Sequence, residues 1–217
     1  MKTFKRALGI AVTAACGVMA GQTVAAETGG YIGVGIGQSR IDLDENEINS
    51  AFASLGLGAT TSVDKTDIGF KVYGGYQFNR NVALELGYTD FGKFTSHSIV
   101  TSGGSGTLDA EWKAYAVDLS VLGILPLGQS GASLFVRGGG GAYKLKFDAT
   151  AVGPGGTAST SESKSGFAPL LGLGATYDFT PNFGVRAEIE RHFDLGDEDT
   201  TGKGDVDLIS VAVQFRF

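Results

Sequence analysis

Cysteine, methionine and proline are scarce in this sequence of 217 residues, and no apolar run approaches twenty residues. The chain has 1 cysteine, 2 methionines and 4 prolines, against 35 glycines. With only Cys16 it cannot form an internal disulfide, so its stability has to come from burial of apolar side chains. A membrane-spanning helix needs roughly 20 consecutive apolar residues, so a helical membrane protein is excluded.

Basic residues are fewer than acidic ones. Lys and Arg number 17 and Asp and Glu number 23, which gives a formal net charge of −6. An acidic chain without a basic stripe is not expected to bind nucleic acid. No Cys/His cluster has the spacing of a metal site, so neither a metal nor another cofactor is expected.

The first 26 residues have the pattern of a secretory signal peptide. Lys2, Lys5 and Arg6 precede an uncharged apolar run from position 7 to 20, and small residues at 24–26 offer a cleavage site. Cys16 lies inside that run, and Thr13 stands where a lipoprotein signal has Leu, so lipidation is disfavoured. We expect residues 27–217 to form one domain, whose net charge is −9 once the three basic residues of the signal are removed from −6.

The last twelve residues alternate with a period of two. This places on one face the apolar set Ile209, Val211, Val213, Phe215 and Phe217, and on the other face Leu208, Ser210, Ala212, Gln214 and Arg216. The closing strand of a transmembrane barrel has this pattern, because one face meets lipid and the other the lumen. The edge strand of a soluble sandwich is the alternative. Alternation that ends in Phe also resembles the sorting signal by which outer-membrane barrels reach the barrel-assembly machinery.

Seven further segments alternate in the same way, at 31–41, 66–78, 82–92, 111–125, 132–147, 167–179 and 183–193. The register beyond the four glycines 138–141 stays open. Long connections at about 42–65, 93–110, 148–164 and 194–205 alternate with short turns, and residues 45–57 suit a short helix. The sequence therefore predicts an all-β fold, an eight-stranded antiparallel up-and-down transmembrane β-barrel with four external loops and both mature termini in the periplasm.

Aromatic residues gather at the two ends of the apolar face. Near the short turns and the C-terminus lie Phe78, Tyr177, Phe179, Phe183, Phe215 and Phe217; toward the long loops lie Tyr88, Tyr115, Phe167 and Phe193. Two aromatic belts around an aliphatic band are typical of a bilayer environment. A soluble barrel would have to fit these side chains inside, so the apolar face is predicted to point outward.

The order and spacing of several short segments resemble the transmembrane domain family of outer-membrane protein A. The matching segments are residues 31–37 (YIGVGIG), 74–79 (GGYQFN), 84–88 (LELGY), 186–188 (RAE) and 210–217 (SVAVQFRF). The resemblance covers nearly all of residues 27–217 and implies an integral protein of the bacterial outer membrane. Members with a peptidoglycan-binding domain continue past the last strand, so tethering to the cell wall by that route is not expected.

Charged residues from several strands fall on the inward face of the expected barrel. They are Lys71, Glu85, Asp118, Arg137, Arg186, Glu188, Glu190 and His192. Charges in a narrow lumen have to pair, and we expect Glu85 with Arg186, and Arg137 with Glu188 or Asp118. The resemblance implies that such ion pairs plug the barrel and gate small solutes; a purely structural polar core is the alternative.

Catalysis is not expected, because only His97 and His192 could act as the base of a serine nucleophile: His97 lies in a loop among serines, and His192 has Asp194, not Ser, two residues after it. The acidic run at 197–199 fits a solvated loop better than a divalent-cation site. The predicted function is a mainly structural role in envelope integrity. A small-solute porin with a lumenal salt-bridge gate, and an adhesin or immune-interaction protein acting through its loops, are the alternatives. The expected surroundings are outer-membrane lipid and lipopolysaccharide, with a host or surface ligand at the loops as a further option, and the chain is expected to be a monomer.

Overall fold

The computed structural model describes residues 28–42, 45–197 and 202–217. The expected signal peptide lies outside this part of the chain. The elements in chain order are β1 (Gly29–Ile41), α1 (Glu45–Ser54), β2 (Gly58–Asp64), β3 (Thr66–Asn79), β4 (Val82–Ser102), β5 (Thr107–Pro126), β6 (Ala132–Gly153), β7 (Gly156–Asp178), β8 (Phe183–Asp197) and β9 (Gly202–Arg216).

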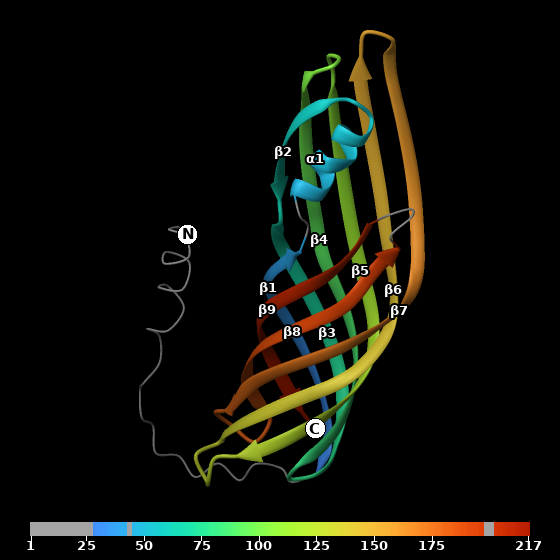
Figure 1. Ribbon diagram of the computed structural model, residues 1–217. Coiled ribbons are helices and arrows are strands. Elements are labelled where there is room, and N and C mark those ends of the chain that lie inside the picture. Colours follow the sequence, from blue (N-terminus) through green and yellow to red (C-terminus); the bar gives the residue numbers. More distant parts are fainter. Residues whose placement is uncertain (1–27, 43–44, 198–201) are drawn as a thin grey trace.

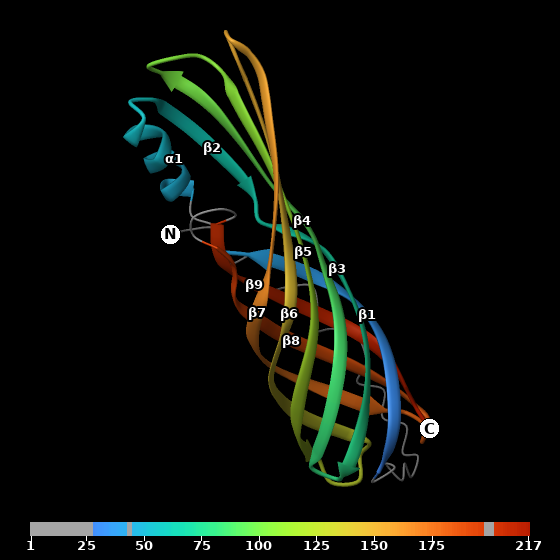
Figure 2. The ribbon, with the colours of Figure 1, turned by 90° about the vertical axis from the view of Figure 1, so that its right-hand side faces the viewer.

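Eight of these strands close into a ring. β1 pairs with β3 on one side and with β9 on the other, and strands β3 to β9 follow one another in chain order. Every pair is antiparallel, and β2 is added only to the outer part of β4. Figure 1 and Figure 2 show the tilted strands winding around the barrel, with the C-terminus at one end and α1 at the other. The predicted eight-stranded up-and-down barrel is confirmed.

The side-chain pattern inverts that of a soluble barrel. Along β9, Ile209 and Val211 are 60% and 61% exposed, whereas Ser210 between them is 5% exposed. Through glycines 138–141, β6 pairs with β5 without a register shift, and Arg137, Gly141 and Tyr143 are all buried, so the register that the sequence left open is resolved. On β5 the outward apolar side chains extend from Leu125 to Tyr115. Ten steps of about 3.3 Å along a strand tilted by about 40° rise about 25 Å, the height of a bilayer-spanning band. We call this outward surface the apolar band.

Glycine gives the interior room for large side chains. A Cβ atom placed on Gly33 would lie 2.2 Å from Tyr73 Cζ, so the tyrosine ring occupies the space that the missing side chain leaves. Small inward residues on one strand thus accommodate long side chains from another.

The loops are much shorter than the sequence predicted. Pairing of β4 with β5 continues to Ile99 and Thr107, and pairing of β6 with β7 continues to Gly153 and Gly156. Most of 93–110 and 148–164 is therefore strand, in two long hairpins (β4–β5 and β6–β7) that project past the ring and that we call ribbons (Figure 2). The two ribbons pair with each other through β5 and β6, and β2 pairs with the outer part of β4. Residues 58–64 form β2, and parts of 194–205 belong to β8 and β9. The start of β7 is exposed on both faces, and the buried face of β4 carries the small polar Ser96 and Ser98, so neither stretch shows the apolar alternation that reveals a strand.

The helix expected within 45–57 is present as α1. No helix in the described ranges is long and apolar enough to cross a membrane. Two register shifts, after Asp90 and after His192, change which side chains point inward. Past them, Phe94 and Leu195 lie inside, and Phe193, expected outward, is half-buried.

Candidate functional site

All eight charged residues singled out in the sequence lie inside the barrel, and none is more than 5% exposed. We call them the ionic layer: Lys71 on β3, Glu85 on β4, Asp118 on β5, Arg137 on β6, and Arg186, Glu188, Glu190 and His192 on β8. Strands on opposite walls contribute to it because the inward side chains of all of them reach the same level of the narrow lumen.

Arg186 is held by charge on one side and by aromatic rings on the other. Its Nη1 donates to Glu85 Oε2 at 2.6 Å, and its Nη2 lies 3.0 Å from Glu188 Oε2. The guanidinium stacks over the rings of Tyr73 and Phe135, 4.6 and 4.2 Å from their centroids. A guanidinium stacked between rings and paired with carboxylates is held in one orientation. The structure thus contains the Glu85–Arg186 pair expected from the sequence.

Arg137 is the centre of the ionic layer. Its Nη2 donates to Asp118 Oδ2 at 2.7 Å and its Nη1 to Glu190 Oε2 at 2.9 Å. Nη1 also reaches Glu188 Oε1 at 3.2 Å, so both partners considered for Arg137 contact it. A Cβ atom on Gly141 would lie 2.0 Å from a carbonyl oxygen of β5, so glycine there permits the close approach of β5 and β6 beside Asp118.

Lys71 and His192 complete the layer. Lys71 Nζ donates to Glu188 Oε2 at 2.9 Å and to Glu190 Oε2 at 2.5 Å. His192 Nε2 lies 3.7 Å from Asp118 Oδ1, and its ring meets the edge of Phe91 with centroids 4.9 Å apart. Three cations thus face four carboxylates, and the histidine lies at the rim of the layer.

Two apolar layers enclose the ionic layer, and the sequence reading missed their size. On the side of the ribbons lie large inward side chains from β4, β5, β6, β8 and β9, among them Phe91, Phe94, Trp112, Tyr143, Leu145 and Leu195. Toward the C-terminal end lie Tyr31, Tyr73, Ala83, Leu122 and Phe135. Trp112 lies within the predicted strand 111–125 and has the inward parity of Ala114, so strict alternation already points it inward. Phe94 and Leu195 point inward because of register shifts, which the sequence periodicity does not reveal.

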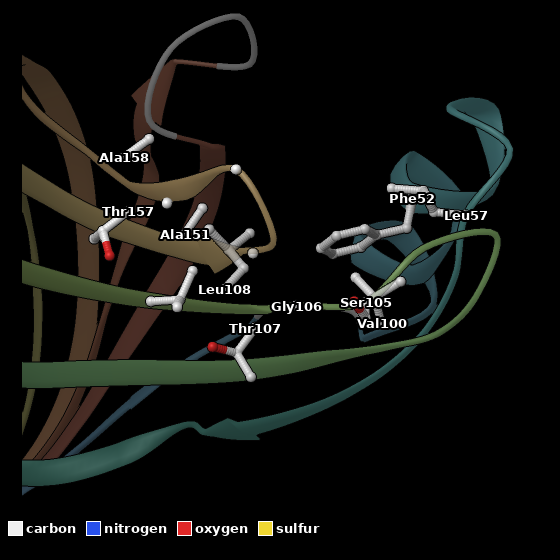
Figure 3. Close-up of a pocket in the computed structure, with 14 residues that line it drawn as sticks. Phe52, Leu57, Val100, Ser105, Gly106, Thr107, Leu108, Ala151, Thr157 and Ala158 are labelled. Atoms are coloured by element: carbon white, nitrogen blue, oxygen red, sulfur yellow. The ribbon is translucent and has the colours of Figure 1, made fainter.

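The end of the molecule that carries α1 has a small apolar cavity of about 390 Å³. It lies between α1, which contributes Phe52, and the ends of the two ribbons, which contribute Val100, Leu108 and Ala151 (Figure 3). None of its lining residues is ionisable. Gly103 lets β4 meet the end of α1, since a Cβ atom there would lie 2.4 Å from Gly56 O.

Within the described residues, no group of three or more His, Cys, Asp or Glu side chains is placed to hold a metal ion. Most of the acidic run at 197–199, considered above as a cation site, lies outside the described residues. His97 lies outside the barrel, with Nδ1 2.5 Å from Asp109 Oδ1 on the neighbouring strand.

Comparison with known proteins agrees with this architecture. The family model described as OmpA-like transmembrane domain matches residues 25–217. Outer membrane protein A of Yersinia pseudotuberculosis serotype I is 30% identical over 154 residues, which cover 70% of this chain and 41% of that protein. Outer membrane protein A of Serratia marcescens is 26% identical over 214 residues, covering 98% of this chain and 56% of the relative. The chain therefore spans about half the length of these curated relatives.

Among solved structures, Ail, the attachment invasion locus protein of Yersinia pestis, superimposes with a TM-score of 0.51 at 21% identity. The match covers 88% of this chain and 100% of Ail. A likeness at this identity carries the fold and no more.

Proposed function

The chain belongs to the OmpA-like transmembrane domain family and is a bacterial outer-membrane β-barrel protein, and we propose that its main role is structural. The observation that carries this proposal is the filled lumen. An ionic layer whose side chains are at most 5% exposed lies between two apolar layers, so the interior resembles a protein core more than a water-filled pore.

We infer the orientation in the membrane from the connections between the strands. The short turns lie at the end of the barrel where β1 begins and β9 ends, and the long ribbons lie at the other. Outer-membrane barrels have short periplasmic turns and longer external loops. The mature termini are therefore assigned to the periplasm and the ribbons to the exterior. The assigned partners are outer-membrane lipid and, during assembly, the barrel-assembly machinery at the outward face of β9, and the barrel is taken to act as a monomer.

Current recording across a planar lipid bilayer tests the structural role. The purified protein, folded as judged by its heat-dependent gel mobility, is expected to insert without opening a steady pore. Loss of the protein from cells is expected to increase leakage of periplasmic enzymes, and the wild-type chain is expected to reverse this. A steady conductance of the wild type would contradict the structural role.

A small-solute porin is the second candidate, because the ion pairs have alternative partners within reach. Glu85 Oε1 lies 3.4 Å from Arg137 Nη1, and Arg186 also contacts Glu188. A shift of Arg186 from Glu85 to Glu188 would exchange partners without leaving a charge unpaired, which is what a gate requires. Under this hypothesis Glu85→Ala enlarges or abolishes a conductance that the wild type already shows.

Surface recognition is the third candidate, and the free edge of β7 favours it. β7 pairs with β8 only from Leu170 to Asp178, so its stretch from Gly156 to Pro169 has no described strand on that side. An exposed strand edge can take up an extended peptide through backbone hydrogen bonds. Deleting residues 150–159, which removes the tip of this ribbon, would abolish binding to host cells or serum factors while leaving the gel mobility of the barrel unchanged.

A further inference from the structure

Four lysines form a continuous patch on the outer surface of three neighbouring strands. In the strand register Lys93 on β4 lies opposite Lys113 on β5, and Lys113 lies opposite Lys146 on β6. Lys144 lies two residues before Lys146 and points to the same side, opposite Tyr115. We call Lys93, Lys113, Lys144 and Lys146 the lysine row.

Like charges directly opposite one another on a sheet repel, so the lysine row needs negative charge nearby. The described carboxylates supply only part of it. Glu111 lies 2.6 Å from Lys113 Nζ and 3.8 Å from Lys93 Nζ, and Asp90 accepts from a backbone N–H in the adjacent bulge. Asp148 lies on the same face of β6, opposite Glu111 and two residues beyond Lys146, so the four lysines face three described carboxylates. For Lys144 and Lys146 there is no acidic side chain within ion-pair distance among the described residues.

The other wall of the barrel balances its charge internally at the same level. Arg191 on β8 donates from Nε and Nη2 to Asp207 on β9 at 2.6 and 2.7 Å, and its Nη1 lies 3.5 Å from Asp205 Oδ2. Arg191 is thus neutralised by two carboxylates, which the described residues do not provide for Lys144 and Lys146.

The height of the lysine row on the barrel identifies the missing anion. Tyr115 ends the apolar band, Lys144 lies level with it, and Lys113 lies two residues beyond, about 5 Å farther along the barrel axis. Lipid headgroups begin at this height, and a lysine side chain reaches several ångströms toward them.

We propose that the lysine row binds the phosphate groups of a lipid headgroup in the outer leaflet, of the phosphorylated glycolipid type, with Lys144 and Lys146 as the principal contacts. Two ammonium groups two residues apart on one strand suit a phosphate better than a neutral sugar. Tyr115, level with Lys144, packs beside the upper part of the acyl chains. The inference rests on the proposed outward orientation of the ribbons.

Native mass spectrometry of the folded protein in detergent, titrated with diphosphorylated lipid A, tests this site. Lys144→Gln/Lys146→Gln is expected to weaken binding roughly thirtyfold, since each lysine near an anionic surface contributes about one kcal/mol. The matched control, Arg40→Gln/Lys65→Gln, removes two positive charges elsewhere and is expected to change binding less than twofold. Lys144→Arg/Lys146→Arg, which keeps both charges, is expected to bind as the wild type does, and heat-dependent gel mobility reports the fold of each variant.

The lipid supplies the second comparison. Dephosphorylated lipid A is expected to bind the wild type roughly thirtyfold more weakly than diphosphorylated lipid A does. For the dephosphorylated lipid, the glutamine variant is expected to have the same affinity as the wild type. Equal loss for both lipids, equal loss in the control variant, or full competition by millimolar inorganic phosphate would overturn the proposal. A wild type that fails to insert into lipid vesicles would instead refute the membrane assignment, so the two failures are distinguishable.

Discussion

Removing the Arg186 guanidinium tests whether the lumen is closed. In Arg186→Met the side chain keeps most of its length and its packing between Tyr73 and Phe135, but Glu85 loses its contact at 2.6 Å and Glu188 its contact at 3.0 Å. The ionic layer would then hold two cations, Arg137 and Lys71, against four carboxylates. Breaking a fully buried ion pair from one side costs about 3–5 kcal/mol, because the remaining carboxylates cannot be solvated.

Urea unfolding in lipid vesicles, followed by the fluorescence of the single tryptophan, Trp112, measures the free energy of unfolding. Trp112 is 8% exposed inside the barrel, so its emission shifts when the barrel opens. With a denaturant slope of about 2 kcal/mol per molar urea, the expected loss lowers the midpoint by about 2 M. Glu85→Gln/Arg186→Met is expected to recover part of the loss, since it also removes one of the unpaired carboxylates.

If Arg186→Met loses less than about 1 kcal/mol of unfolding free energy and still shows the heat-dependent gel mobility of a folded barrel, the closed lumen is refuted. It would mean that water reaches the ionic layer and solvates the remaining charges. The matched control is Lys146→Met, which makes the same type of change on the outer surface and is expected to alter the unfolding free energy by less than about 0.5 kcal/mol.

Two further predictions concern the outer face and the strand contacts. Leu173→Arg, near the middle of the apolar band on β7, is expected to lower the free energy of unfolding in vesicles by about 2–4 kcal/mol. Phe167→Arg, at the edge of the band, is expected to lower it by at most about 1 kcal/mol. Equal losses would show that the two positions do not differ in bilayer depth. Gly141→Ala is expected to reduce the yield of the heat-modifiable folded form severely, because the added Cβ atom would lie 2.0 Å from a carbonyl oxygen of the neighbouring strand. Gly155→Ala, with no atom within 4 Å of the added group, is its control, and equal yields for the two would contradict the close strand contact.

The barrel could be predicted from the sequence because the bilayer imposes a period of two on every strand. The outward set on β9, from Ile209 to Phe217, needs no tertiary information: one face is uniformly apolar and the other is not. The ion pair between Glu85 and Arg186 could also be predicted from the sequence. An inward charge requires a partner, and few inward residues carry the opposite sign.

The ribbons and the inner apolar layers could not be predicted in this way. Residues 156–163 are exposed on both faces, and along 93–102 the buried positions include the small polar Ser96 and Ser98, so neither stretch gives an apolar period of two. The bulge after Asp90 adds residues to one strand only, so Phe94 turns inward against the simple count. Both features depend on pairing with a neighbouring strand, which a single sequence does not specify.

Which way the apolar side chains of β9 point can be measured directly. Residues 27–217 contain no cysteine, so single cysteines introduced at positions 208–215 can each carry a nitroxide label in vesicles. Labels at 209, 211, 213 and 215 are expected to be accessible to oxygen, which concentrates in the bilayer, and shielded from a water-soluble nickel complex. Labels at 208, 210, 212 and 214 are expected to be shielded from both, inside a filled barrel. The opposite parity, or access of the nickel complex to the inward positions, would contradict a barrel with lipid outside and a closed core within.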